Sequence, residues 1–248
     1  MRLLPLISVL IARTALAQPV ESREISIAGW PDVTAFLAMI ADIMPVNHAL
    51  RDICGVITAG ELAISTIFGI PTTENDGCGD VTMFFARGTC DPGNVGALTG
   101  PWFFKVLEDK LKRSGKRLAV NGFDYPASVD GYLNGSKGNG DKLAAKIKST
   151  IAACPNTKVV IGGYSQGGMV VHDAAKALDA QTMSKVNAVV IFGDPYSKRA
   201  VEKIDKSKVK IVCHKGDNIC DNGPIITFEH LNYALDAFSA ADFVMTKV

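Results

Sequence analysis

Short apolar runs rich in β-branched residues recur along the chain, and each predicts a buried β-strand. Longer segments between them carry apolar residues at helical spacing. The expected strands are residues 81–86, 117–121, 159–161, 186–192 and 209–213, and the expected helices are residues 101–114 and 141–153, one that follows Ser165, and residues 237–245. Strands that alternate with helices in this way predict a single α/β domain with a parallel, doubly wound sheet and helices on both faces.

Two helical patterns precede the first expected strand. Residues 30–44 form an amphipathic pattern, and residues 47–69 predict one or two further helices. Thr58 and Glu61 have the spacing of a capping box, which would start a helix there. This helical segment, residues 30–77, either packs against the outside of the core or covers a functional cleft, and the pattern leaves both possibilities open.

The beginning of the chain has the pattern of a secretory signal. Arg2 supplies a positive start, residues 3–11 form an apolar core, and a small-x-small cleavage site ends at residue 17. Residues 1–17 are therefore expected to be removed, and residues 18–29 would form a short tail or propeptide. No later apolar run reaches the length of about 20 residues that a membrane span needs. We expect an exported, soluble protein without an integral membrane segment.

Charge argues against two classes of partner. The formal net charge is +1, and removal of Arg2 and Arg13 with the signal would leave −1. Binding to nucleic acid or to an anionic membrane depends on a strong excess of positive charge. Neither is therefore expected as the main partner.

The chain has six cysteines, an even number that predicts three disulfides in an exported protein: Cys54, Cys78, Cys90, Cys154, Cys213 and Cys220. Spacing pairs only Cys213 with Cys220, because they close a short loop. A metal site is disfavoured, since there is no C-x-x-C pair and no histidine at ligand spacing beside a cysteine pair. Asn134 begins the only N-glycosylation sequon.

A candidate nucleophile lies between the third expected strand and the helix after it. Residues 163–167 read Gly-Tyr-Ser-Gln-Gly and fit G-x-S-x-G, with Ser165 at the sharp turn. In a strand-to-helix context the motif holds the serine hydroxyl out at the carboxyl end of the sheet. The alternative is an ordinary turn, because glycine and serine are common in turns. The context favours Ser165 as a nucleophile.

A serine nucleophile needs a histidine base, and the chain has four histidines. His48 lies in the N-terminal helical segment, where a surface or packing role is expected. His172 lies two helical turns beyond Ser165 on the same helix and cannot reach back to it. His214 adjoins a predicted disulfide and is interpreted as structural. His230, in a loop after the last expected strand, is the remaining candidate.

The base needs an orienting carboxylate, which enzymes with this turn place between the serine and the histidine in the chain. Asp217 fits best, because it lies directly beyond the fifth expected strand in a loop that Cys213 and Cys220 would brace. Asp194 is the second choice and Asp221 the third. For the oxyanion hole, the backbone N–H of Gln166 is one expected donor, and Thr89, after the first strand, is either the second donor or a plain turn residue.

Four separated motifs resemble the cutinase family. They are residues 84–89 with 92–96, residues 154–155 leading to 162–167, residues 213–220 with Gly216-Asp217 inside, and His230-Leu231 with Tyr233. The resemblance covers residues 78–248 and implies an α/β-hydrolase domain with five parallel strands. It also implies a triad of Ser165, Asp217 and His230, with an oxyanion hole at Gln166 and at both the backbone and hydroxyl of Thr89.

The family disulfides carry over as Cys78–Cys154 and Cys213–Cys220, which leaves Cys54 and Cys90 for the third. The helical segment before Cys78 is longer than in the smallest cutinases and resembles the lid-bearing, Trichoderma-type branch. The activity that the resemblance implies is that of a secreted serine esterase. Its substrates would be cutin, a hydroxy-fatty-acid polyester, and soluble short-chain esters.

No metal or organic cofactor is expected, and we expect a monomer whose partner is cutin, another polyester or a lipid ester. Two alternatives remain open at this stage. One is an acetylxylan esterase of the same fold, and the other is a non-catalytic secreted protein that binds a surface or is recognised by plants.

Overall fold

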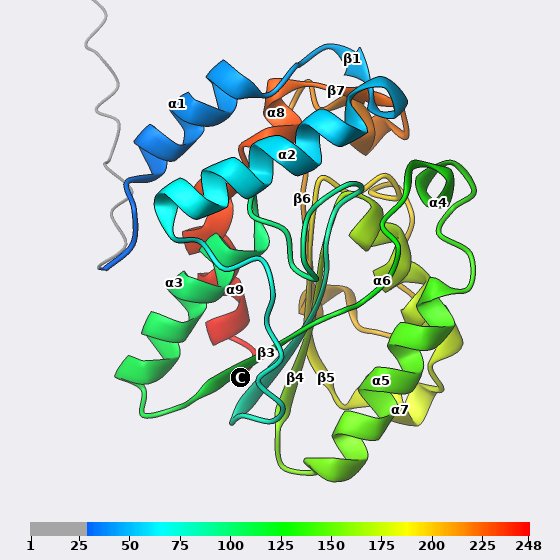
Figure 1. Cartoon of the computed structure of the whole chain (residues 1–248). Helices are drawn as coiled ribbons and strands as arrows, with labels where there is room; N and C mark the ends of the chain where they lie inside the picture. Colours follow the sequence, from blue (N-terminus) through cyan, green and yellow to red (C-terminus); the bar gives the residue numbers. More distant parts are fainter. Residues whose placement is uncertain (1–28) are drawn as a thin grey trace, which may run out of the picture.

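A computed structural model describes residues 29–248, and at its centre is a five-stranded parallel sheet (Figure 1). The strand order is β3-β2-β4-β5-β6. The strands are β2 (Val81–Ala86), β3 (Leu118–Gly122), β4 (Lys158–Tyr164), β5 (Val186–Phe192) and β6 (Val209–Val212). All five apolar runs formed strands, so the predicted fold class is confirmed. The predicted signal and tail, residues 1–28, lie outside the described residues.

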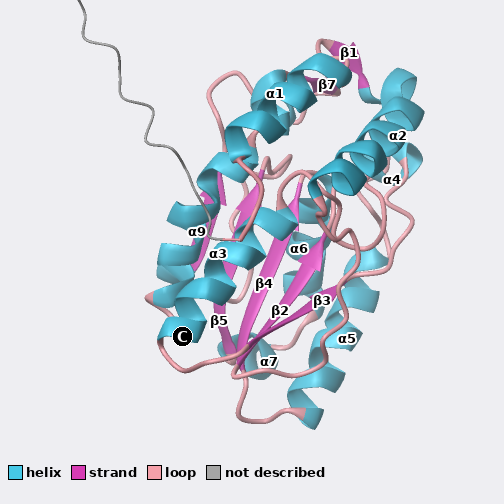
Figure 2. Ribbon diagram, turned by 60° about the vertical axis from the view of Figure 1, so that its left-hand side comes forward, coloured by secondary structure: helices cyan, strands magenta, loops and turns pink. Residues whose placement is uncertain are grey.

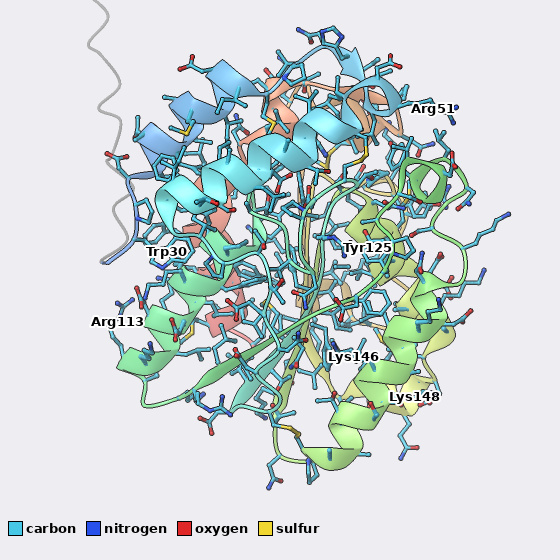
Figure 3. All side chains as sticks on the ribbon, in the orientation of Figure 1. Trp30, Arg51, Arg113, Tyr125, Lys146 and Lys148 are labelled. Carbon is cyan, nitrogen blue, oxygen red and sulfur yellow. A yellow bond between two sulfur atoms is a disulfide. The ribbon has the colours of Figure 1, made fainter. Side chains whose placement is uncertain are left out.

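Helices cover both faces of the sheet (Figures 1 and 2). One face carries α3 (Gly100–Arg113) and α9 (Ala237–Met245), and the other carries α5 (Asn139–Ala153), α6 (Gln166–Ala177) and α7 (Ala180–Ser184). Charged side chains such as Arg113 and Lys148 project outward from these helices (Figure 3). The sheet is therefore buried on both sides, which is why its strands are continuous apolar runs rather than alternating ones.

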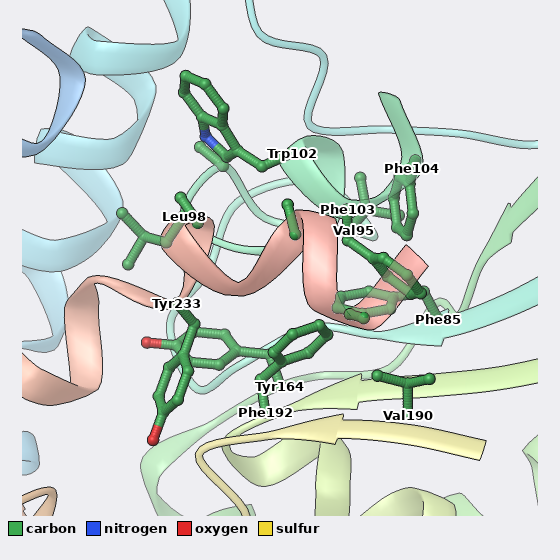
Figure 4. Packing of buried hydrophobic residues seen from close by; sticks show 14 of the residues in the cluster. Phe85, Val95, Leu98, Trp102, Phe103, Phe104, Tyr164, Val190, Phe192 and Tyr233 are labelled. Atoms are coloured by element: carbon green, nitrogen blue, oxygen red, sulfur yellow. The ribbon is translucent and has the colours of Figure 1, made fainter. Parts of the chain in front are cut away.

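Aromatic side chains fill the core between the sheet and α3 (Figure 4). Phe85 of β2 packs edge-on against Phe104 at 5.0 Å between ring centroids, and Phe192 of β5 against Phe103 at 5.5 Å. Tyr164, at the end of β4, belongs to the same cluster. This core fixes the carboxyl ends of the three central strands relative to one another.

The strand order places two loops side by side. From β2 the chain moves outward to β3, then returns across β2 to form β4 on its other side. The loops that leave β2 and β4 therefore meet at the point where the winding direction reverses. In open α/β sheets this point is where ligands bind.

Two N-terminal helices lie across the carboxyl ends of the strands (Figure 2). Helix α1 (Val33–Ile43) begins later than its pattern predicted, because the Asp32 carboxylate caps it by accepting from the N–H of Thr34 at 2.6 Å. Helix α2 (Leu50–Phe68) is a single helix that ends at Gly69 with φ of +65°.

The predicted capping box at Thr58 and Glu61 is wrong, since both residues lie inside α2. The Thr58 hydroxyl instead donates to two carbonyls, Cys54 within α2 at 3.2 Å and Cys90 across the interface at 2.7 Å. Glu61 points inward and is fully buried. Thr58 and Glu61 thus have the spacing of a capping box, but both side chains bind the loop after β2 instead of the start of a helix.

Several short elements had no signal in the sequence. A two-stranded antiparallel sheet joins β1 (His48–Ala49) to β7 (Ile225–Ile226) and connects the start of α2 to the segment before α8 (Phe228–Leu231). Helix α4 (Val129–Leu133) forms between β3 and α5, and its exposed Asp130 forms an ion pair with Arg51 of α2 at 3.4 Å. Three 3₁₀ turns cover Lys206–Lys208, Asn218–Asp221 and Tyr233–Asp236.

The six cysteines form three disulfides, Cys54–Cys90, Cys78–Cys154 and Cys213–Cys220. The family resemblance implied the last two pairs, and elimination left the first. The first joins α2 to the loop after β2, and the last closes the loop that contains Asp217. Across residues 29–248, no helix has the length and apolarity needed to cross a membrane.

Candidate active site

Ser165 lies at a strained turn between β4 and α6, with φ of +56° and ψ of −122°. A non-glycine residue adopts such a conformation only where its surroundings impose it. The neighbouring glycines leave no room for a side chain: a Cβ on Gly163 would come within 2.6 Å of the Gly167 carbonyl oxygen, and one on Gly167 within 1.9 Å of the Ala86 carbonyl oxygen. The G-x-S-x-G spacing therefore follows from close packing between β4, α6 and β2.

His230 and Asp217 form a buried pair. His230 Nδ1 donates to Asp217 Oδ2 at 2.8 Å, and both side chains are almost entirely removed from solvent. The Tyr233 hydroxyl donates to the same oxygen at 2.6 Å, and the Ile219 N–H to Oδ1 at 2.9 Å. Burial alone would raise the pKa of Asp217, but the hydrogen bonds and charge of His230, then Tyr233 and Ile219, lower it below its usual value. Asp217 is thus an ionised acceptor, and Nε2 of His230 is left free to take a proton.

The imidazole of His230 is held on several sides. The Tyr164 ring stacks on it at 5.1 Å between centroids, and the Tyr164 hydroxyl donates to the His230 carbonyl at 2.9 Å. At Gly193, which has φ of +58°, a Cβ would come within 2.7 Å of His230 Cε1. His230, Ser165 and Thr89 line one small cavity. Residues from the loop after β2, the turn after β4 and helix α8 therefore converge at the carboxyl edge of the sheet.

The other candidate bases and acids have different partners. Asp194 accepts from His172 Nε2 at 2.9 Å and from the Tyr196 N–H at 2.8 Å, so it orients His172 rather than His230. Asp221 pairs with Lys198 at the surface. His48 belongs to β1 and is exposed. His214 pairs with Asp236.

Thr89 and Gln166 meet beside Ser165. The side-chain amide of Gln166 is satisfied when its oxygen accepts from the Tyr132 N–H at 2.8 Å and its nitrogen donates to Thr89 Oγ1 at 3.0 Å and to the Ser128 carbonyl at 3.3 Å. We adopt this orientation because the opposite one would set the amide oxygen against the Ser128 carbonyl. Thr89 Oγ1 is then an acceptor from Gln166, and its own proton is free to point into the cavity.

Helix α2 closes the site. The cavity beside Ser165 has a volume of only about 10 Å³, and Leu50 and Ile57 of α2 form part of its wall. Ser165 is 4% exposed. The Cys54–Cys90 disulfide and the hydrogen bond from Thr58 to the Cys90 carbonyl attach the same helix to the loop of Thr89. The cavity is too small for an ester substrate to reach Ser165 in this conformation.

Comparison with known proteins places the chain among its relatives. The family model described as Cutinase matches residues 77–248. The chain belongs to the cutinase family. A cutinase of Hypocrea jecorina is 51% identical over all of both chains, and cutinase cut1 of Trichoderma harzianum is 53% identical over the same extent. The chain is therefore a carboxylic ester hydrolase of this family.

Solved structures agree with this assignment. Trichoderma reesei cutinase in complex with a phosphonate inhibitor is 54% identical, with a TM-score of 0.76 over 88% of this chain and 98% of that one. An acetylxylan esterase solved at 0.90 Å is 21% identical, with a TM-score of 0.55 over 68% of this chain and 99% of that one. The second likeness shows a shared fold alone.

Sequence reasoning assigned no role to Tyr233 or Tyr164, although both residues were part of the family motifs. Both tyrosines act through contacts with residues distant in the chain, which the local sequence does not encode. Within residues 29–248, no group of histidine, cysteine, aspartate or glutamate side chains has an arrangement that could hold a metal ion.

Proposed function

We propose that the protein is a secreted serine esterase that hydrolyses the ester bonds of cutin and of soluble short-chain esters through an acyl-enzyme on Ser165. One observation carries this proposal. Ser165, on a strained turn, shares a cavity with His230, and the buried Asp217 carboxylate holds Nδ1 of His230 at 2.8 Å.

In the proposed mechanism, Ser165 Oγ attacks the ester carbonyl while Nε2 of His230 takes its proton. Asp217 keeps the imidazole in the tautomer whose Nε2 is free and stabilises the imidazolium. The oxyanion would be bound by the backbone N–H groups of Thr89 and Gln166 and by the Thr89 hydroxyl. His230 then protonates the leaving alcohol, and a water activated by the same histidine releases the acid from Ser165.

The N-terminal helical segment, residues 30–77, is proposed to act as a lid on the catalytic domain, residues 78–248. The closed cavity requires α2 to move before a substrate binds, and the apolar side chains around it suit an acyl chain: Leu50, Ile57, Ile226 and Leu231. A disulfide between Cys54 and Cys90 limits this movement, because it holds the first half of α2 near the loop of Thr89.

The proposed setting is extracellular, with a polyester or lipid ester as the partner and a monomeric enzyme. Three disulfides in the described residues support an oxidising compartment. N-terminal sequencing of the secreted protein tests whether it begins near residue 18.

The experiment that tests the function combines labelling with hydrolysis. A p-nitrophenyl alkylphosphonate should modify Ser165 and abolish release of fatty acids from cutin and of nitrophenol from p-nitrophenyl butyrate. Ser165→Ala should be inactive on both and resist the label, whereas Ser184→Ala, on the surface helix α7, should behave as wild type. Wild-type protein that stays unlabelled at Ser165 in the presence of detergent would refute the proposal.

Two further measurements separate the alternatives. Turnover on acetylated xylan that exceeds turnover on the butyrate ester would move the substrate class to acetylxylan. A mobile lid predicts that detergent raises the rate on long-chain esters, and an unchanged rate would remove the lid while leaving the esterase in place.

A further inference from the structure

His214 lies beside the proposed triad, and both of its ring nitrogens face oxygen acceptors. Nε2 is 2.6 Å from Asp236 Oδ2, and Nδ1 is 2.9 Å from the backbone carbonyl oxygen of Glu229. A carbonyl cannot donate, and neither can a carboxylate. A neutral imidazole beside an ionised Asp236 would therefore set one lone pair against another. The geometry therefore requires an extra proton, either on the second nitrogen of His214 or on the Asp236 carboxyl group.

The surroundings favour that proton on the histidine. Asp236 immediately precedes α9 and so lies at the positive end of that helix. The hydrogen bond that the His214 ring donates to Asp236 raises the pKa of His214 above its usual value, although partial burial opposes this rise. The charge of Asp236, the Glu229 carbonyl and the Asn232 side chain add to it. The ring also stacks on Tyr233 at 4.2 Å between centroids and 23° between planes, and an aromatic face attracts a cation.

The other charged groups near His214 come from its own loop and from α8. Lys215 is its chain neighbour, and Asp217 lies further along the same loop. The Glu229 carboxylate packs beside Gly216, within 3.9 Å of where a Cβ on that residue would be. His230 follows Glu229 in α8. Two ionisable side chains contact the His214 ring directly, Asp236 through its carboxylate and Tyr233 through its stacked ring.

Protonated His214 joins the elements that carry the acid and the base of the triad. Its Nδ1 holds the carbonyl of Glu229, the residue immediately before His230. Its backbone N–H donates to the Tyr233 hydroxyl at 3.1 Å, and that hydroxyl donates to Asp217 Oδ2 at 2.6 Å. His214 follows Cys213, whose disulfide with Cys220 closes the loop that carries Asp217. His214 thus joins two parts of the site, because its side chain holds the backbone before His230 and its backbone N–H connects through Tyr233 to the Asp217 carboxylate.

We propose that His214 is a positioning residue for the proposed triad, and that it works only while doubly protonated. Loss of its proton would break one of the two hydrogen bonds and loosen α8 against the Asp217 loop. The contribution is complete below the unperturbed histidine pKa of about 6.5 and is lost as pH rises through the higher value in the folded protein. This rests on the proposed function, and it predicts an alkaline fall in kcat that reports on His214.

The test measures kcat and KM of the mature protein on p-nitrophenyl butyrate from pH 5 to 10, with active sites counted by phosphonate titration. Asp236→Asn removes the carboxylate that holds the proton on His214 and should move the alkaline fall to lower pH by about one unit. His214→Gln keeps one of the two hydrogen bonds. It should lower kcat about threefold to tenfold at pH 6 and remove the alkaline fall, with KM little changed.

Two matched controls make the same kinds of substitution at residues that do not contact His214 or Asp236. Asp221→Asn alters a surface carboxylate, and His48→Gln an exposed histidine, and both should retain the wild-type profile. If Asp236→Asn or His214→Gln fails to fold, the NMR resonances of the His214 ring in the wild-type protein still provide a test. They should titrate with the midpoint of the alkaline fall in kcat.

An Asp236→Asn profile that superimposes on wild type would overturn the inference. A wild-type His214 ring that titrates well away from the midpoint of the kcat fall would also overturn it. The same holds if His214→Gln lowers kcat by an equal factor at every pH. These outcomes differ from a failure of the proposed function, in which Ser165→Ala would remain active.

Discussion

Glu61 and Asp91 place two carboxyl groups together in the interior, between α2 and the loop after β2. Glu61 Oε2 accepts from the Ala97 N–H at 2.9 Å, and Asp91 Oδ2 from the Gly88 N–H at 2.8 Å. Burial and then the neighbouring Asp91 charge raise the pKa of Glu61 well above its usual value. Burial likewise raises the pKa of Asp91, although Glu61, the Gly88 N–H and the nearby Arg87 oppose this. The two carboxyl groups can lie this close together because they share one proton in a hydrogen bond.

Replacing Glu61 with glutamine should make this contact independent of pH. The amide has the same shape, its nitrogen donates permanently to Asp91, and its oxygen can still accept from Ala97. In the wild type, stability falls as pH rises from the unfolded glutamate pKa of about 4.3 towards the raised value, by about 1.4 kcal/mol per pH unit. Glu61→Gln avoids this loss. Its free energy of unfolding should exceed that of wild type by about 1–3 kcal/mol at pH 8, with little difference at pH 4.

Urea unfolding with intact disulfides, followed by tryptophan fluorescence from pH 4 to 8, measures the difference. In thermal melts, each kcal/mol should appear as an increase of about 2–4 °C in Tm. Glu202→Gln is the matched control, because its carboxylate is exposed and its curve should follow wild type. A stability difference between Glu61→Gln and wild type that does not change with pH would refute the shared proton. A variant less stable than wild type at pH 8 would do the same.

Three further predictions concern the site. Thr89→Val should lower kcat on p-nitrophenyl butyrate about a hundredfold, because it removes a hydroxyl donor from the proposed oxyanion hole, and Thr89→Ser should restore most of the rate. Tyr233→Phe should lower kcat about threefold to thirtyfold with KM little changed, because Asp217 loses a buried hydrogen bond, and steady-state kinetics at pH 7 decides this. Replacing both Cys54 and Cys90 with serine should free α2, and so reduce the stimulation of long-chain ester hydrolysis by detergent. It should also lower the free energy of unfolding by about 2–4 kcal/mol; an unchanged detergent response would argue against a tethered lid.

The sheet and the turn at Ser165 were predictable because each depends on local constraints. A strand buried on both faces must be apolar throughout, so the five strands were visible as uninterrupted runs. Ser165 was visible because the backbone of β2 passes so close to Gly167 that only glycine fits. Asp217 and His230 followed from chain order, and the structure brings them together at 2.8 Å.

Side chains that act through distant partners could not be predicted in the same way. Asp194 follows a strand just as a catalytic acid would, and only the fold reveals that His172 occupies its carboxylate. Glu61 has the spacing of a helix cap, yet its proton-sharing partner lies 30 residues further along the chain. Periodicity cannot distinguish these cases, because a buried polar residue is stabilised by whatever group the fold places opposite it.

The helical segment before the catalytic domain shows the same limit for a whole element. Its inward apolar residues could have packed against any part of the core, and their spacing is identical in a lid and in an ordinary surface helix. What distinguishes α2 is its set of polar and covalent connections to one loop, through Cys54, Thr58 and Glu61. All three attach α2 to the part of this loop that follows Thr89, at Cys90 and Ala97. A helix connected in this way cannot move without affecting the oxyanion loop, so access to Ser165 and the geometry around Thr89 are expected to change together.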